Sequence, residues 1–278
     1  MAIEAATMDS RDGIEATVNY IARSAEPLFA YAYESPPGMP QKNAVREPHS
    51  VRIADARQLQ PPASLEREGF SLRRHRTAVA NFYDEDEVRR VCYPEVERLV
   101  REATGASDVM VFDHDVRNTA PERQIRKLVK AAAASVHNDY TECSAPRRVR
   151  ELLAPADAEA RLKRRYLVIN VWRPITGPVE SWPLALCSAQ SLDWSDLTAT
   201  EWRYPDRVGE VYSVGYNPRH RWFYYPRLRI DEALVFKCFD SATDGRARFS
   251  AHTAFNDPAT PVNAAPRESI EVRSFAFF

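Results

Sequence analysis

The pattern of apolar and polar positions changes character part-way along the chain. In the first part, apolar residues recur at helical spacing. Glu85–Ala103 carries valines and leucines three or four positions apart and is followed by Gly105, a residue typical of a helix end. The same reasoning predicts two further helices, over 120–135 and 147–164. Short strands are predicted between and before them, at 108–113 and, as an edge strand, at 50–54.

From Tyr166 onward, segments rich in β-branched and aromatic residues alternate with turns. Short strands separated by turns, with no strand–helix–strand rhythm, are typical of an antiparallel barrel or a jelly roll rather than a doubly wound sheet. The chain is therefore predicted to be mainly β with flanking helices. The strands are expected at 166–173, 211–216, 221–225, 234–239, 248–255 and 269–277.

The N-terminal segment, residues 1–48, has a different texture. A short apolar stretch, Leu28–Tyr33, is followed by closely spaced prolines at 36–40. We expect an extended arm on the domain surface and a single domain with helical insertions over 49–278. An exposed arm can also pair two subunits, so a homodimer is one expectation.

Composition removes several classes of function. The 38 basic and 39 acidic residues give a net charge of −1, so no nucleic-acid partner is expected. Eight isolated glycines make no phosphate-binding loop. The beginning of the chain lacks the apolar region of a signal peptide, and no stretch of about 18 apolar residues suggests a membrane span. Four scattered cysteines fit a reducing, cytoplasmic location.

The segment Val136–Tyr140 carries the candidate chemistry. His137 and Asp139 are two residues apart, so in an extended chain both side chains point to the same face. An imidazole, a carboxylate and a distant second histidine make a facial triad that suits iron(II) and leaves coordination positions open. A His-x-Asp pair by itself is weak, because it also arises in ordinary structure.

Two histidines in the strand-rich part can complete the triad. His220 lies in a turn-like segment, where a solvated side chain is expected. His252 lies among small and aromatic residues, in a predicted strand, where an inward-facing histidine needs a partner such as a metal. His252 is therefore the preferred third ligand, and His220 is excluded only by its turn context.

Two further groups of residues suggest a binding pocket beside the metal. Arg267 and Ser269 share one face of a late strand and make a receptor for a carboxylate, although a surface arginine is the alternative. In the strand 166–173, Asn170 and Trp172 lie on the face opposite the aliphatic side chains and are predicted to line the pocket. Ordinary core packing is nearly as good an interpretation of each residue alone.

These residues resemble the H-x-D…H…R-x-S pattern of iron(II)/2-oxoglutarate oxygenases with a double-stranded β-helix (jelly-roll, cupin-like) core. The chain more closely resembles the hydroxylase/desaturase family of secondary metabolism, which includes fungal desaturase- and endoperoxide-forming enzymes and the bacterial cephalosporin 7-alpha-hydroxylase component. The similar stretches run from about residue 50 to the C-terminus and include 112–117, 136–140, 170–174, 182–186, 231–241 and 266–273.

The resemblance implies an Fe(II)/2-oxoglutarate-dependent dioxygenase that uses O2. It would hydroxylate or desaturate a small molecule through a ferryl intermediate and release succinate and CO2. His137, Asp139 and His252 would hold the iron, and Arg267 with Ser269 the distal carboxylate of 2-oxoglutarate, in a pocket lined by Asn170 and Trp172.

The spacing from His252 to Arg267 is longer than in the plant-type enzymes, so Arg273 is a second candidate for the anchor. The roles of Asp113 and His114 stay open, as does that of Arg117, which either contacts substrate or pairs with an aspartate. Two alternative functions are a cupin-like metal enzyme that does not use 2-oxoglutarate and a non-catalytic barrel that binds a small molecule or a partner protein. The pattern does not distinguish hydroxylation, desaturation and ring formation.

Overall fold

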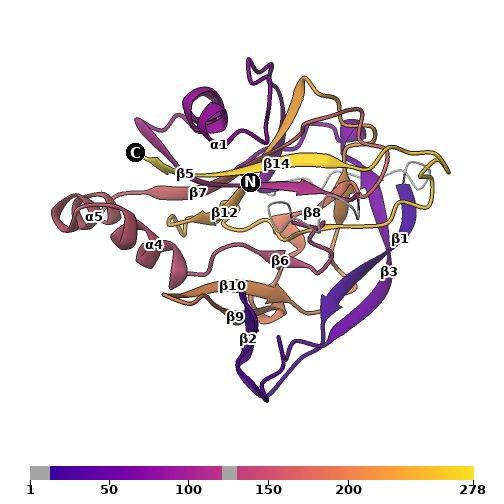
Figure 1. Ribbon diagram of the computed structural model, residues 1–278, viewed down its shortest axis with the longest axis horizontal. Helices are drawn as coiled ribbons and strands as arrows, with labels where there is room; N and C mark the ends of the chain where they lie inside the picture. Colours follow the sequence, from indigo (N-terminus) through magenta and orange to yellow (C-terminus); the bar gives the residue numbers. More distant parts are fainter. Residues whose placement is uncertain (1–12, 121–129) are drawn as a thin grey trace.

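The computed structural model describes residues 13–120 and 130–278, and in these ranges the chain forms two facing β-sheets with helices outside them (Figure 1). In Figure 1 the yellow strand β14 and its neighbours form one layer, and β6, β10 and β9 lie in the layer opposite. The prediction of a mainly β chain with flanking helices is confirmed.

The smaller sheet has five strands, and all neighbours are antiparallel. Its central strand, β7, is buried over all nine residues, as its apolar sequence requires. The order across the sheet is β4 (Phe70–Arg74), β12 (Glu232–Asp240), β7 (Tyr166–Pro174), β14 (Glu268–Phe277) and β5 (Asp108–Asn118).

The larger sheet has nine strands, which are short and mostly antiparallel. The strands β6 and β13 lie side by side near its middle, and this pairing builds the candidate site. The order is β1 (Gly13–Ile21), β3 (Arg46–Asp55), β11 (Trp222–Tyr224), β8 (Leu184–Cys187), β13 (His252–Ala254), β6 (His137–Asn138), β10 (Val208–Val214), β9 (Leu197–Arg203) and β2 (Leu28–Tyr31).

The N-terminal segment contributes to this larger sheet. Strand β1 pairs with β3 along nine residues, and Val18 and Tyr20 on it are fully buried. Strand β3 lies between β1 and β11, so the expected edge position of 50–54 is wrong. The polar residues that alternate along β3 indicated an edge strand, but they alternate because one face of β3 stays partly exposed.

The two faces of β7 divide the core as predicted. Tyr166, Val168 and Trp172 point between the sheets, where they join a cluster with residues of the larger sheet such as Leu186. The alternate residues, Leu167, Ile169 and Val171, pack on the outside against Val96 and Leu99 of a helix. The inward face of the smaller sheet is therefore available to line a site.

The predicted helix over 85–103 is confirmed. It comprises α1 (Glu85–Glu87), a π-helical turn (Val88–Cys92) and α2 (Tyr93–Thr104), and Gly105 ends it with a φ of 73°. The helix predicted over 147–164 is divided into α4 (Ser144–Leu152) and α5 (Pro155–Leu162), because Pro155 lacks an N–H and restricts the residue before it. Short 3-10 turns occur at Ala56–Gln58, Ala189–Ser191 and Trp194–Asp196.

The helix predicted over 120–135 falls mostly on 121–129, which lie outside the described residues. The described residues 130–135 are not helical. Within the described part of the chain, no helix is long and apolar enough to cross a membrane.

Candidate metal centre

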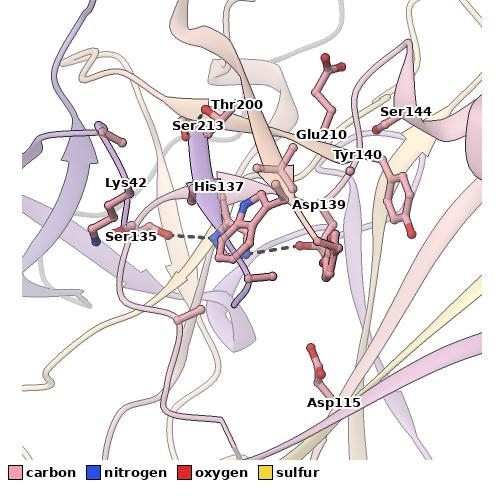
Figure 2. Close-up of a pocket in the computed structure, with 18 of the residues that line it drawn as sticks. Lys42, Asp115, Ser135, His137, Asp139, Tyr140, Ser144, Thr200, Glu210 and Ser213 are labelled. Carbon is pink, nitrogen blue, oxygen red and sulfur yellow. Dashed lines mark hydrogen bonds and ion pairs between the residues drawn. The ribbon is translucent and has the colours of Figure 1, made fainter. Parts of the chain in front are cut away.

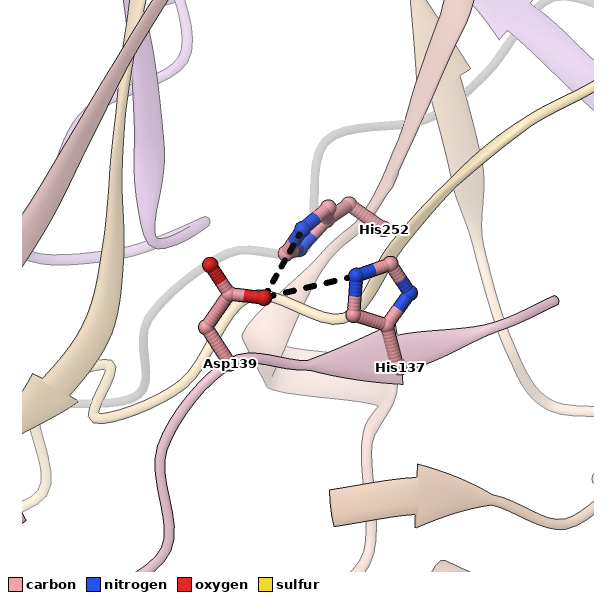
Figure 3. Close-up of side chains that lie close together, drawn as sticks. All are labelled: His137, Asp139 and His252. Carbon is pink, nitrogen blue, oxygen red and sulfur yellow. Dashed lines mark ion pairs between the residues drawn. The ribbon is translucent and has the colours of Figure 1, made fainter. Parts of the chain in front are cut away.

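Three side chains converge between the two sheets: His137, Asp139 and His252 (Figure 3). His137 on β6 and His252 on β13 are direct register partners, and Asp139 follows two residues after His137. Oδ1 of Asp139 lies 3.4 Å from Nε2 of His137 and 3.9 Å from Nε2 of His252. The sequence prediction therefore names three residues that the fold brings together.

Each imidazole is oriented by a backbone carbonyl. Nδ1 of His137 lies 2.8 Å from the oxygen of Ser135, and Nδ1 of His252 lies 3.0 Å from the oxygen of Ser250. A carbonyl only accepts, so Nδ1 of each ring carries a hydrogen, and in the neutral form of the ring Nε2 presents its lone pair to the centre. This is the orientation of a metal-ligating histidine.

The Nε2 atom of His252 is buried and has no hydrogen-bond partner among the described residues. A buried polar atom left unpaired costs roughly 1–3 kcal/mol. Burial, and then the neighbouring His137, lower the pKa of His252 to about 3, so the ring is neutral. A metal ion at this point would satisfy the lone pair of Nε2.

Asp139 is held so that its two oxygens differ. Oδ2 accepts from Nδ2 of Asn170 at 2.8 Å and from Nε of Arg273 at 2.9 Å, while Oδ1 faces the two imidazoles. Burial alone would raise the pKa of Asp139, but the charge of Arg273 and the neighbouring His137 hold it well below its usual range. The carboxylate is therefore ionised, with Oδ1 directed at the centre.

Two imidazole nitrogens and one carboxylate oxygen form the donor set that proteins use for non-haem iron(II) with open coordination positions. The unpaired Nε2 of His252 and Oδ1 of Asp139, which faces both imidazoles, fit this ion. The residues present therefore fit an iron(II) centre.

Arg273 is fully engaged by carboxylates. Besides Asp139, its guanidinium contacts Asp115 at 3.2 Å, Asp113 at 3.3 Å and Glu271 at 2.5 Å. These contacts explain Asp113, one of the residues left open by the sequence. They also leave Arg273 without a free face for the carboxylate of a co-substrate.

The other two open residues are now placed. Arg117 lies 3.5 Å from Asp115 and donates to the backbone oxygen of Ala131, so it pairs with an aspartate. The ring of His114 contacts the hydroxyl of Tyr93 at 2.9 Å and Glu85 at 3.2 Å, both from the helical segment outside the smaller sheet. His114 is therefore not part of the site.

Arg267 is a buried cation with no ion-pair partner among the described residues. Arg267 is only 4% exposed. Its Nη1 donates to the backbone oxygen of Trp182 at 2.6 Å, and its guanidinium lies 5.5 Å from the centre of the Trp172 ring. Its Nε has no hydrogen-bond partner among the described residues. Burial lowers the pKa of Arg267 to about 9. The Ser269 hydroxyl, on the same strand face, is also buried and unpaired within the described ranges. The surface-arginine alternative is therefore wrong.

His220 is excluded from the centre by its contacts. Its Nε2 lies 3.0 Å from Asp196 and its Nδ1 lies 3.1 Å from the hydroxyl of Tyr20. The expectation that His220 is solvated is wrong, because its side chain is 1% exposed. An aspartate and a tyrosine, distant in the sequence, satisfy both ring nitrogens, and no sequence pattern indicated them.

A pocket of about 690 Å³ opens onto the centre, and His137, Asp139 and Arg273 belong to its lining (Figure 2). Sequence reasoning missed most of this lining. Part of it comes from residues 42–46 of the predicted arm and part from the β9–β10 hairpin, and neither segment has a motif. Asn170 was expected to bind a co-substrate, but it contacts the carboxylate of Asp139.

Comparisons with known proteins agree with this geometry. A family model described as "Oxidoreductase/YMDC permease-like domain" matches residues 18–277. The "Hydroxylase/desaturase efuI" of Hormonema carpetanum is 32% identical, with 95% of each chain covered. The "Fe(II)/2-oxoglutarate-dependent dioxygenase nvfI" of Aspergillus novofumigatus is also 32% identical, with 92% of each covered. The chain belongs to this family of Fe(II)/2-oxoglutarate-dependent hydroxylases and desaturases.

The solved structures support the same assignment. The "iron and alpha-ketoglutarate-dependent endoperoxidase NvfI" matches with a TM-score of 0.87 and 29% identity, covering 96% of this chain and 99% of that one. The predicted jelly-roll core is therefore confirmed. The protein is an enzyme of the Fe(II)/2-oxoglutarate-dependent dioxygenase type that acts on a small molecule, with iron(II), 2-oxoglutarate and O2 as its cofactor and co-substrates. Family membership decides against the two alternative functions.

Proposed function

We propose that His137, Asp139 and His252 hold the catalytic iron(II) of a hydroxylase or desaturase of secondary metabolism. The observation that carries this assignment is the buried, unpaired Nε2 of His252, which lies 3.9 Å from Oδ1 of Asp139. When bound, iron(II) and 2-oxoglutarate would together activate O2, the oxidant that removes hydrogen from an unactivated carbon, with succinate and CO2 as by-products.

The protein's own residues position these groups and exclude water. Arg267 and Ser269 receive the distal carboxylate of 2-oxoglutarate, because both are buried and retain an unpaired atom. The Trp172 ring packs against the Arg267 guanidinium and forms the wall of that pocket. Asn170 and Arg273 hold Oδ2 of Asp139, so that Oδ1 alone is presented to the metal.

Two further proposals concern the setting of the enzyme. A cytoplasmic location agrees with the four cysteines, all of which are free thiols, three of them buried. The absence of a nucleic-acid partner agrees with the balanced charge of the chain. Pairing of two subunits through the N-terminal segment stays a prediction.

Consumption of 2-oxoglutarate tests the assignment of the centre. Purified protein with iron(II), 2-oxoglutarate and O2 is expected to form one succinate for each 2-oxoglutarate consumed, and a chelator is expected to stop this turnover. The variant His252→Gln is expected to lose turnover, whereas His220→Gln keeps it. Full turnover in His252→Gln would contradict the ligand assignment.

A further inference from the structure

The pocket that opens onto the metal centre carries more positive than negative charge. Its lining contains eight basic and five acidic residues, although the whole chain has a net charge of −1. A cleft lined by one sign of charge concentrates ligands of the opposite sign. The basic residues are Lys42, Arg46, Arg117, Lys130, Arg147, Arg148, Arg207 and Arg273, and the acidic ones are Asp113, Asp115, Asp139, Glu151 and Glu210.

Most of these charges already have partners. Asp115 receives Lys130, Arg117 and Arg273, and Glu151 receives Arg148. These ion pairs neutralise some of the basic residues in the lining, and other basic residues have no carboxylate partner in the described part of the chain.

Among the described residues, the lining cations without a carboxylate partner are Lys42, Arg46, Arg147 and Arg207, and the first two lie on the segment 42–46. Arg46 donates from Nε to the hydroxyl of Ser135 at 2.9 Å and has no carboxylate partner among the described residues. Lys42 makes no side-chain hydrogen bond or ion pair in the described part of the chain, and burial, followed by the charge of Arg46, lowers its pKa. Lys42 and Arg46 are both exposed at the pocket and lie four positions apart on one segment.

These two cations lie near the metal ligands. The backbone oxygen of Ser135, the residue that Arg46 contacts, accepts from Nδ1 of His137. Figure 2 places Lys42 and Ser135 on one side of His137, with Asp139 on the other. An anion bound to Lys42 and Arg46 is thus attached beside the reaction centre.

The rest of the lining suits an apolar molecular body. Alanine is the most frequent apolar residue between the charged groups, so this part of the wall consists of small apolar side chains. The apolar lining residues include Ala30, Ala44, Ala131, Ala132, Ala133, Val136 and Val211.

We propose that the substrate is an organic anion whose carboxylate is bound by Lys42 and Arg46 while its apolar body lies along the alanine-rich wall. This inference rests on the proposed function, because it takes this pocket as the substrate pocket. The fixed carboxylate sets which carbon faces the centre, so Lys42 and Arg46 determine specificity. The carboxylate of 2-oxoglutarate is a different anion and is assigned to Arg267, which does not belong to this lining.

Two matched dyes test the proposal with the full chain. Anilinonaphthalene sulfonate is an anion, and N-phenyl-1-naphthylamine has the same ring system without the charge. The double variant Lys42→Gln/Arg46→Gln is expected to bind the anionic dye at least about tenfold more weakly and the neutral dye unchanged. The control is Lys163→Gln/Arg164→Gln, two exposed cations at the end of α5 outside the pocket, which is expected to change neither.

Several results would overturn the proposal. The affinities for both dyes could fall equally in the double variant, or neither could fall. The affinity for the anionic dye could fall equally in the control variant, or it could fall in Arg147→Gln and not in the double variant. A raised KM for 2-oxoglutarate in Lys42→Gln/Arg46→Gln would assign the two cations to the co-substrate instead. Iron binding is measured on the same samples: wild-type protein that binds iron but shows no anion preference refutes only this inference, whereas protein without iron affinity refutes the proposed function.

Discussion

Nε of Arg273 donates to Oδ2 of Asp139 at 2.9 Å and so ties the last strand of the smaller sheet to a metal-ligand candidate beside the larger one. Asn170, the register partner of Arg273 on β7, donates to the same oxygen. With both donors on Oδ2, the carboxylate can offer only Oδ1 to a metal. Arg273 is a positioning residue for Asp139.

Replacement of Arg273 tests this role. Arg273→Gln removes one of the two donors to Oδ2 and leaves Asn170 alone to hold Asp139, so iron affinity is expected to fall by roughly 10- to 100-fold. Equilibrium competition with a coloured chelator measures the affinity. The control is Arg117→Gln, which loses a contact with Asp115 but none with Asp139. Equal affinity in wild type and Arg273→Gln would show that Arg273 serves another purpose.

The anchor for 2-oxoglutarate is tested at Arg267. Arg267→Gln removes a buried charge that meets a carboxylate, an effect of about 2–5 kcal/mol, so the KM for 2-oxoglutarate is expected to rise by roughly 30-fold or more while iron affinity is kept. Ser269→Ala is expected to act in the same direction and more weakly. If Arg273→Gln raises this KM and Arg267→Gln does not, the two arginines have been assigned the wrong way round.

The third ligand is tested by iron stoichiometry. His252→Gln is expected to bind less than about a tenth of the iron that wild-type protein binds. His220→Gln breaks the contacts with Asp196 and Tyr20 but touches no ligand, so folded protein is expected to keep full iron content. Metal analysis after gel filtration gives both values. Iron loss in His220→Gln with the fold intact would contradict the assignment.

A buried ion pair predicts the response to acid. Asp240 and Lys237 are both fully buried, and Oδ2 of Asp240 lies 2.7 Å from Nζ of Lys237 and 2.7 Å from Arg165. Burial would raise the pKa of Asp240, but the Arg165 hydrogen bond and the charge of Lys237 lower it overall. The stabilisation is therefore present above the unfolded-state pKa of about 4 and is lost as the pH falls below it.

Asp240→Asn removes the buried charge partner of Lys237 and leaves it only the half-exposed Glu66 at 3.3 Å, so it is expected to lower the free energy of unfolding by about 3–5 kcal/mol at pH 7. Urea unfolding of both proteins measures the difference, which is expected to shrink below about pH 4. A difference that stays constant from neutral pH down to about pH 3 would show that the pair does not supply the stability.

Local patterns predicted the parts of the molecule that depend on local interactions. The two faces of β7 and the end of α2 at Gly105 follow from side-chain periodicity and helix-end chemistry. The pair His137 and Asp139 was visible for the same reason, since alternate residues of an extended segment share a face.

Features that depend on pairing between distant segments could not be read from the sequence. The choice of His252 over His220 depends on β13 lying beside β6, and the role of Arg273 depends on which side chain the other sheet places opposite it. Strand β8 is too short to show a period of side-chain burial. Strand β1 was predicted as part of an extended arm, because its pairing with β3 depends on a distant segment.

Anaerobic loading with iron(II) followed by 2-oxoglutarate tests the central claim most directly. Wild-type protein is expected to develop a weak visible absorption band, because 2-oxoglutarate binds to iron held by His137, Asp139 and His252. The band is expected to be absent in His252→Gln and to require more 2-oxoglutarate in Arg267→Gln. If wild-type protein loaded with iron shows no band at any 2-oxoglutarate concentration, or if His252→Gln shows the full band, the account is wrong.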